Sequence, residues 1–287
     1  MKNPMAERNE SAPENSLEIA AKPRTLRRLI LETTHRAGMG HTGGSLSEAE
    51  ILIALYFRVL RNIDPAEPAR PTRDRFILSK GHASVGYYAA LAMRGYFPLS
   101  ELETFDVLGT RLQAHPDMSL APGVDFSTGS LGQGLSVGIG MALASRDLPA
   151  LGSFVTFVLL GDGELQEGQV WEAALYAGSA GLPRLVAIVD SNDVQLSSRT
   201  SDAVALEPLA AKWRDFGWRT FEVDGHDLDA VCAALGDARA FSSEGPAVVL
   251  ARTVKGKGVS FMEGRWEWHG KAPNDAEFAA AMKELDS

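Results

Sequence analysis

One stretch decides the fold of this chain: FVTFVLLGDGE, at residues 154–164. The apolar run at 154–160 predicts a buried strand, and the Gly-Asp-Gly sequence that follows ends it. The two glycines let backbone N–H groups approach a ligand closely, and Asp162 offers a hard oxygen for a cation. We therefore predict a site for a diphosphate and Mg²⁺ at the end of this strand. A plain strand-to-helix turn is the alternative.

A second apolar run, LVAIV at residues 185–189, is expected to bring Asn192 beside Asp162. Residues 167–180 between the two runs predict a helix, whose positive N-terminal end points at the same loop. A strand-helix-strand unit makes the two strands parallel neighbours, so both polar residues arrive where open α/β sheets bind ligands. Asp and Asn oxygens with a backbone carbonyl would leave positions on Mg²⁺ for two phosphate oxygens and a water.

The rest of the chain continues this alternation and predicts an α/β fold, a parallel sheet with helices on both faces. Ser47 and Glu50 resemble a capping box that opens a helix at residue 48. We expect a disordered tail over residues 1–16 and one domain over residues 17–287. Further helices are expected at residues 17–37, 48–59, 83–94, 134–146, 210–216, 228–240 and 275–285, further strands at 75–78, 219–223 and 247–253, and a loop at 38–44.

Composition is typical of a soluble enzyme. The 28 basic and 37 acidic residues give a net charge of −9, which argues against nucleic acid as a partner. The single cysteine, Cys232, excludes an intramolecular disulfide and suits a reducing cytoplasm, and its helical surroundings predict a small core residue. We expect no signal peptide and no membrane span, because no apolar run approaches the necessary length, and therefore a cytoplasmic location.

The histidines divide into two groups. Four of the six stand in loops flanked by Gly, Pro or Trp, where a ligand can approach them, and we predict functional roles for these. His226 is expected to be mainly structural, in an Asp-Gly turn, and His35 to be a partly exposed helix residue. The four candidates are His41, His82, His115 and His269.

Five separated sequence motifs together point to a family. GDGELQEG at 161–168, answered by Asn192, resembles the thiamine diphosphate signature, and four further motifs occur in the order and approximate spacing of transketolases. Their joint occurrence is far more specific than one glycine-rich loop. The chain therefore resembles the transketolase family over about residues 20 to 275. The four further motifs are SKGHAS at 79–84, AHPD at 114–117, STGSLGQG at 127–134 and WHG at 268–270.

The resemblance implies a thiamine diphosphate-binding fold and a ketol transfer that uses thiamine diphosphate and Mg²⁺. It implies that Asp162, Asn192 and the carbonyl of Val194 bind the metal. His41 and His269 would contact the donor sugar and assist proton transfer, and His115 would hold its C1 hydroxyl end. The remaining cofactor contacts would come from His82, Gly129, Ser130, Leu131, Gly163, Glu167, Asn192 and His269, with Ser130 standing where transketolases often have Pro.

The resemblance also implies a divided active site. In the family, a second domain activates the pyrimidine ring of the cofactor, and no further α/β unit follows the last strand expected here. The chain thus resembles the amino-terminal subunit of a split transketolase, in a heterotetramer with two separate carboxy-terminal subunits. Glu167 matches a family glutamate at the subunit interface, or simply complements a helix N-terminus. Two alternatives are a subunit of a 2-keto acid dehydrogenase or decarboxylase and a non-catalytic cofactor-binding homologue.

Overall fold

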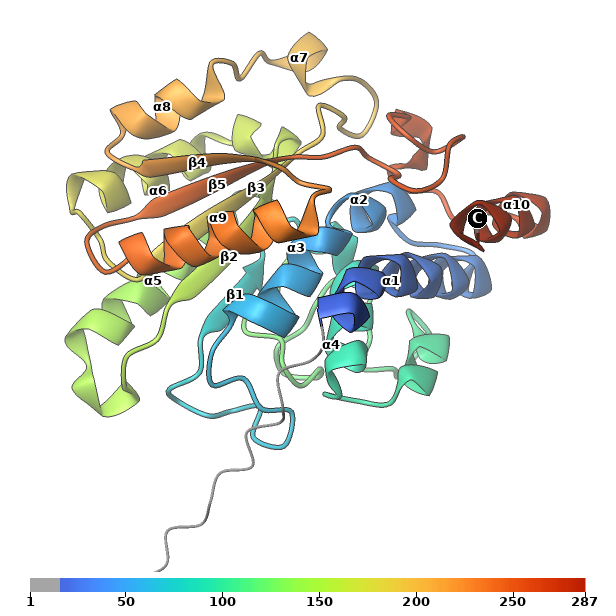
Figure 1. The fold of residues 1–287 in the computed structure, drawn as a ribbon, viewed down its shortest axis with the longest axis horizontal. Coiled ribbons are helices and arrows are strands. Elements are labelled where there is room, and N and C mark those ends of the chain that lie inside the picture. The colour runs from blue at the N-terminus through green and yellow to red at the C-terminus, as the bar shows by residue number, and fades with distance from the viewer. Residues whose placement is uncertain (1–15, 287) are drawn as a thin grey trace, which may run out of the picture.

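The computed structural model of the protein describes residues 16–286 and contains one five-stranded parallel sheet, in the order β1-β2-β3-β5-β4 (Figure 1). The inner strands β2, β3 and β5 are apolar and almost wholly buried, as expected where helices cover both faces of a parallel sheet. The tail expected over residues 1–16 lies outside the described residues, except for Ser16. The strands span Arg75–Leu78 (β1), Thr156–Gly161 (β2), Leu185–Ser191 (β3), Arg219–Asp224 (β4) and Ala247–Arg252 (β5).

Helices cover both faces of this sheet (Figure 1). One face carries α5 (Gln133–Asp147), α6 (Gly168–Ser179) and α8 (Leu209–Asp215), and the other carries α3 (Ala49–Ala54) and α9 (Leu228–Phe241). The outer helices are α1 (Ser16–Ala37), α4 (Ser84–Arg94) and α10 (Asp275–Asp286). Two short helices are α2 (Thr42–Ser47) and α7 (Thr200–Ala203). A π turn lies at Leu55–Val59 (η1), and 3₁₀ turns lie at Gly81–Ala83 (η2), Leu99–Thr104 (η3), Pro149–Leu151 (η4), Gly163–Gln166 (η5) and Trp266–Trp268 (η6).

The connections explain why the polar loops meet. The chain crosses one face through α6 and α8 as it passes from β2 to β3 and then to β4, and it crosses the other face through α9 when it steps back to β5. Right-handed crossovers require this change of face when the direction along the sheet reverses. All five strands therefore end at one edge. In the register, Gly161 pairs with Asp190, and Ser191 pairs with Arg252.

The predicted fold class is confirmed, and most predicted elements differ from the observed ones by one or two residues at their ends. The exception is the stretch predicted as a loop at 38–44 and a helix at 48–59. Here α2 already begins at Thr42, and the later helix is divided into α3 and η1. The capping-box prediction is wrong, because Ser47 ends α2 and its hydroxyl donates to Gly44 O (2.9 Å) and Asp190 Oδ2 (2.6 Å).

Two remaining expectations concern Cys232 and the membrane. Cys232 lies in α9, is half-buried and packs against the core, close to the small core residue that was expected. Within residues 16–286, none of the helices combines the length and the apolar character that a bilayer span needs.

Candidate functional site

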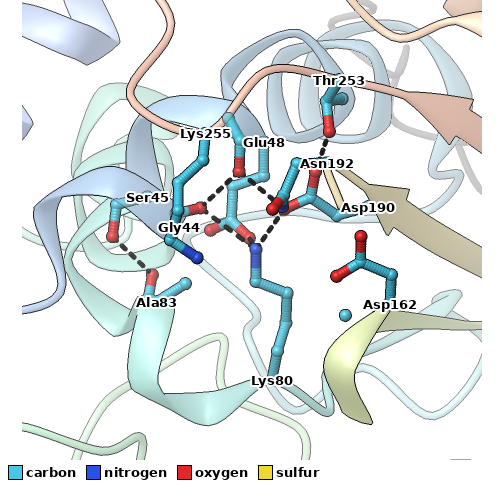
Figure 2. A network of polar contacts seen from close by, with 12 residues as sticks. Gly44, Ser45, Glu48, Lys80, Ala83, Asp162, Asp190, Asn192, Thr253 and Lys255 are labelled. Atoms are coloured by element: carbon cyan, nitrogen blue, oxygen red, sulfur yellow. Dashed lines mark hydrogen bonds and ion pairs between the residues drawn. The ribbon is translucent and has the colours of Figure 1, made fainter. Parts of the chain in front are cut away.

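The site lies at the carboxyl edge of the sheet, in a pocket of about 240 Å³. Asp162 follows β2, Asn192 follows β3 and Lys255 follows β5, so the strand register alone brings these three residues to one place (Figure 2). The segments that carry His82, Leu131 and His269 complete the lining. Its members include Lys80, His82, Leu131, Gly161, Asp162, Gly163, Glu164, Asn192, Val194, Lys255 and His269.

Asp162 is a buried carboxylate at the end of β2. Its side chain is 5% exposed, and its oxygens accept hydrogen bonds from the backbone N–H groups of Gly163 (2.7 Å) and Asp193. Burial, followed by the negative charge of Asp190, raises the pKa of Asp162 to about 6. A carboxylate held in this way is stabilised by a nearby cation.

The other two predicted metal ligands lie in the turn after β3. Asn192 Oδ1 accepts a hydrogen bond from Val194 N (3.1 Å), and its amide nitrogen donates to Asp190 Oδ2 (3.3 Å). The carbonyl oxygen of Val194 accepts from Lys255 Nζ at 2.9 Å. A carboxylate, an amide and a carbonyl therefore line the same pocket, and hard oxygens of these three kinds are the ligands that Mg²⁺ prefers.

The four candidate histidines gather beside these oxygens. The ring of His41 lies 5.1 Å from that of His82, 5.3 Å from that of His269 and 6.3 Å from that of His115, measured between centroids. His82 and His269 line the pocket, whereas His115 is exposed at its rim and packs over Gly129. Residues that are far apart in the sequence thus form one cluster of imidazoles.

Three of these imidazoles, those of His41, His82 and His269, are held in the neutral form. Burial, then the charges of His115 and Lys255, lowers the pKa of His41 to about 4, and burial, then the charge of Lys255, lowers the pKa of His269 to about 3. Burial also brings the pKa of His82 well below its ordinary value. A neutral imidazole offers one N–H donor and one acceptor nitrogen. The buried Nδ1 of His269 has no hydrogen-bond partner among the described residues, so it is available to a ligand.

The glycine-rich loop at 129–132 passes close to the segment after β1. Gly129 and Gly132 adopt positive φ values of +147° and +84°, and a Cβ atom on Gly81 would lie 2.8 Å from Gly129 N. This loop places Leu131 on the pocket, while Gly129 and Ser130 stand outside its lining. Glu167 is exposed at the N-terminus of α6, and its side chain makes no capping bond there.

Three charged residues in the pocket lining were not predicted from the sequence. Glu164 is buried and accepts hydrogen bonds from Ser79 Oγ, Gly132 N (2.9 Å) and Gly161 N (3.1 Å), so it joins three loops. Lys80 and Lys255 are buried ammonium groups, and burial, then the charge of Lys80, lowers the pKa of Lys255 to about 8. All three lie in segments next to predicted strand ends, and this position is the sequence signal that could have placed them in the site.

Comparison with known proteins identifies the family. The family described as "Transketolase, thiamine diphosphate binding domain" matches residues 20–286. The chain is 43% identical to a 6-deoxy-6-sulfo-D-fructose transketolase subunit from Clostridium sp. strain MSTE9, over 95% of this chain and 98% of that protein. It is also 43% identical to an apulose-4-phosphate transketolase subunit from Actinobacillus succinogenes, over 93% of this chain and 96% of that protein.

Solved structures agree with these relatives. A transketolase from Pichia stipitis superimposes with a TM-score of 0.88 at 30% identity, over 94% of this chain and 41% of that one. A transketolase from Leishmania mexicana gives a TM-score of 0.87 at 29% identity, over 93% and 41%. The chain thus spans about two fifths of the length of these transketolases. It belongs to the transketolase family of transferases and corresponds to its amino-terminal, diphosphate-binding part, which confirms the resemblance.

Proposed function

We propose that this chain is the amino-terminal subunit of a two-subunit transketolase. The complex transfers a two-carbon ketol unit from a ketose to an aldose, with thiamine diphosphate and Mg²⁺ as cofactors. The observation that carries the proposal is the gathering of His41, His82 and His269 beside the ends of β2 and β3. The pocket then combines oxygen ligands for a metal diphosphate with imidazoles for a hydroxylated sugar.

The metal would be held by Asp162, Asn192 and the carbonyl of Val194. Two features support this assignment. The buried Asp162 carboxylate has a raised pKa of about 6 and would be stabilised by a cation, and the Val194 carbonyl already accepts from the ammonium group of Lys255. The three oxygens are of the kind that Mg²⁺ takes together with phosphate oxygens and water.

Thiamine diphosphate, when bound, supplies a carbon nucleophile and an electron sink for cleavage of a carbon–carbon bond. Its diphosphate would meet His82, Gly163 and Asn192, while the backbone of Gly129, Ser130 and Leu131, together with His269, would make further contacts. The close approach of Gly81 to Gly129 holds this loop against the segment that carries His82.

The imidazoles would handle the protons of the sugar. Since His41 and His269 are neutral, each can donate a hydrogen bond to a developing alkoxide or accept a proton from a hydroxyl group. His115, exposed beside His41, would hold the C1 hydroxyl end of the donor. These three residues are therefore the proposed catalytic set.

The proposed partner is a separate carboxy-terminal subunit. Relatives that match this chain over nearly their whole length are named as subunits. We propose a heterotetramer with two copies of each chain, with residues 17–287 as one domain and the exposed Glu167 at the subunit interface. The proposed location is the cytoplasm, and neither nucleic acid nor membrane takes part.

The donor sugar would be a ketose with an anionic tail. The relatives named above act, by their names, on a sulfonated ketose and on apulose 4-phosphate. We therefore propose a sugar phosphate or a sulfonated sugar as substrate.

The decisive experiment mixes the chain with its co-encoded complementary subunit in a coupled assay for the released aldose. Xylulose 5-phosphate, apulose 4-phosphate and 6-deoxy-6-sulfofructose are the donors, and a 2-keto acid is the comparison. Ketol transfer that requires both chains, thiamine diphosphate and Mg²⁺ is the expected result. Turnover of the 2-keto acid alone would favour a dehydrogenase or decarboxylase subunit. Cofactor binding without turnover of any donor would favour a non-catalytic homologue.

A further inference from the structure

A buried ammonium group in the pocket lining is held by three oxygens of the chain itself. Lys80 is 2% exposed, and its Nζ donates to Gly44 O at 3.0 Å and to Asp190 Oδ2 at 2.5 Å, and lies 3.1 Å from Glu48 Oε2 (Figure 2). A lysine ammonium carries three N–H donors and no acceptor. Two hydrogen bonds and one ion pair therefore engage the Lys80 ammonium group within the chain.

The three acceptors come from segments that carry proposed site residues. Gly44 lies in α2, three residues after His41, and Asp190 lies in β3, two residues before Asn192. Lys80 itself stands two residues before His82, in the turn after β1. One cation therefore connects the segments that present two of the imidazoles and one of the metal ligands.

The two carboxyl groups around Lys80 are not equivalent. Asp190 also accepts from Ser47 Oγ, Thr253 Oγ1 and Asn192 Nδ2, which together stabilise its negative charge. Glu48 is fully buried, and among residues 16–286 its carboxyl group has no polar partner besides Lys80. Asp190 is therefore the hydrogen-bonded counter-ion of Lys80, and Glu48 is a second carboxyl group at ion-pair distance.

We propose that Lys80 is a positioning residue, whose ammonium group, bound by Gly44, Asp190 and Glu48, holds His41, His82 and Asn192 in their relative places before any cofactor binds. The effect of Lys80 on catalysis rests on the proposed function. The positions that Lys80 gives to His41, His82 and Asn192 do not, because they depend on contacts within the chain itself.

Three variants test the role. Lys80→Met removes the ammonium at similar length, and Glu48→Met removes one acceptor while the ion pair of Lys80 with Asp190 remains. Glu48→Gln is the matched control, because its amide oxygen can still accept from Lys80. Glu48→Met also covers the case in which Lys80→Met does not fold, since loss of the ammonium leaves Asp190 buried without its counter-ion.

The first readout is the ¹H–¹³C NMR signals of the histidine rings in the chain alone, without cofactor or partner. We expect Lys80→Met and Glu48→Met to shift the signals of His41 and His82, and Glu48→Gln to leave them near their wild-type positions. His35, which stacks on Phe278 in α10, is the internal reference. A purely stabilising role would lower the unfolding temperature and leave the ring signals of the folded protein in place.

The second readout is calorimetric affinity for thiamine diphosphate with Mg²⁺ in the complex with the partner subunit. We expect the two methionine variants to lose about tenfold or more in affinity, as happens when residues that orient metal ligands are replaced, and Glu48→Gln to lose less than about threefold. Unshifted His41 and His82 signals in a folded methionine variant, or equal effects of Glu48→Met and Glu48→Gln, would overturn the proposal. An inactive wild-type complex with normal NMR results would contradict the proposed function alone.

Discussion

The ring of His82 stacks on the ring of His269, with centroids 4.9 Å apart and planes inclined by 27°. His82 follows β1 and His269 follows η6, so the pair joins the early and late parts of the chain. Two imidazolium ions could not lie so close in a buried place beside Lys80 and Lys255. The contact therefore depends on both rings being neutral.

This dependence predicts an acid-sensitive fold. The unfolded chain protonates His269 near its ordinary pKa of 6.5, whereas the folded chain does so only near 3, so between these values the unfolded state binds more protons. Stability should fall as the pH drops through this range. Between pH 7 and pH 4.5, we expect the unfolding temperature of His269→Asn to fall less than that of the wild type. Equal losses in scanning calorimetry would contradict the neutral, desolvated state of His269.

The metal assignment predicts a selective defect in Asp162→Asn. The variant should lose about 100-fold or more in Mg²⁺-dependent affinity for thiamine diphosphate, because a charged ligand becomes neutral. Its fold should persist, with a free energy of unfolding within about 1–3 kcal/mol of the wild type, since the amide can keep one of the two backbone hydrogen bonds. Titration calorimetry of the complex measures the affinity, and unchanged binding would remove Asp162 from the metal site.

The sheet and the histidine candidates were predictable because their signals are local. Apolar runs ending in Gly-Asp-Gly or Ser-Lys-Gly-His mark strand ends, and parallel topology then brings those ends together. The roles of Glu164 and Lys80 were not predictable, because each depends on partners distant in the sequence, such as Gly132 or Asp190. The Ser47 capping box failed for the same reason, since a contact with Asp190 in β3 takes its hydroxyl.

His115 is predicted to act on the sugar and not on the cofactor. It is exposed at the rim and lies outside the lining of the pocket, although its ring is 6.3 Å from that of His41. His115→Ala should lower kcat/KM for the donor ketose by about 10²-fold, within the range for loss of a group in proton transfer. Cofactor affinity should change by less than about threefold. A parallel loss of cofactor affinity would assign His115 to cofactor binding instead.

Glu164 is predicted to stabilise the loops of the site. Glu164→Gln replaces one acceptor oxygen by an NH₂ group, which would then face Ser79 and Gly132 or, on the other side, Gly161. The clash of donors should cost about 1–3 kcal/mol of unfolding free energy in urea titrations. Glu167→Gln, three residues along and exposed, is the control and should stay within about 0.5 kcal/mol. Similar effects of the two substitutions would mean that the Glu164 contacts contribute little.

The Glu48 carboxyl predicts a difference in stability that grows with pH. Burial raises its pKa from 4.5 to about 8 in the folded chain, so between these values the folded state holds a proton that the unfolded state has lost. The stability that Glu48 contributes is therefore complete below pH 4.5 and is lost as the pH rises through 8. Glu48→Gln cannot titrate. The free energy of unfolding of Glu48→Gln, relative to that of the wild type, should rise from pH 5 to pH 9. The titration of Lys255 occurs in both proteins and cancels from this comparison. Urea midpoints at pH 5, 7 and 9 measure this difference. A difference that stays constant with pH would mean that folding leaves the ionisation of Glu48 unchanged.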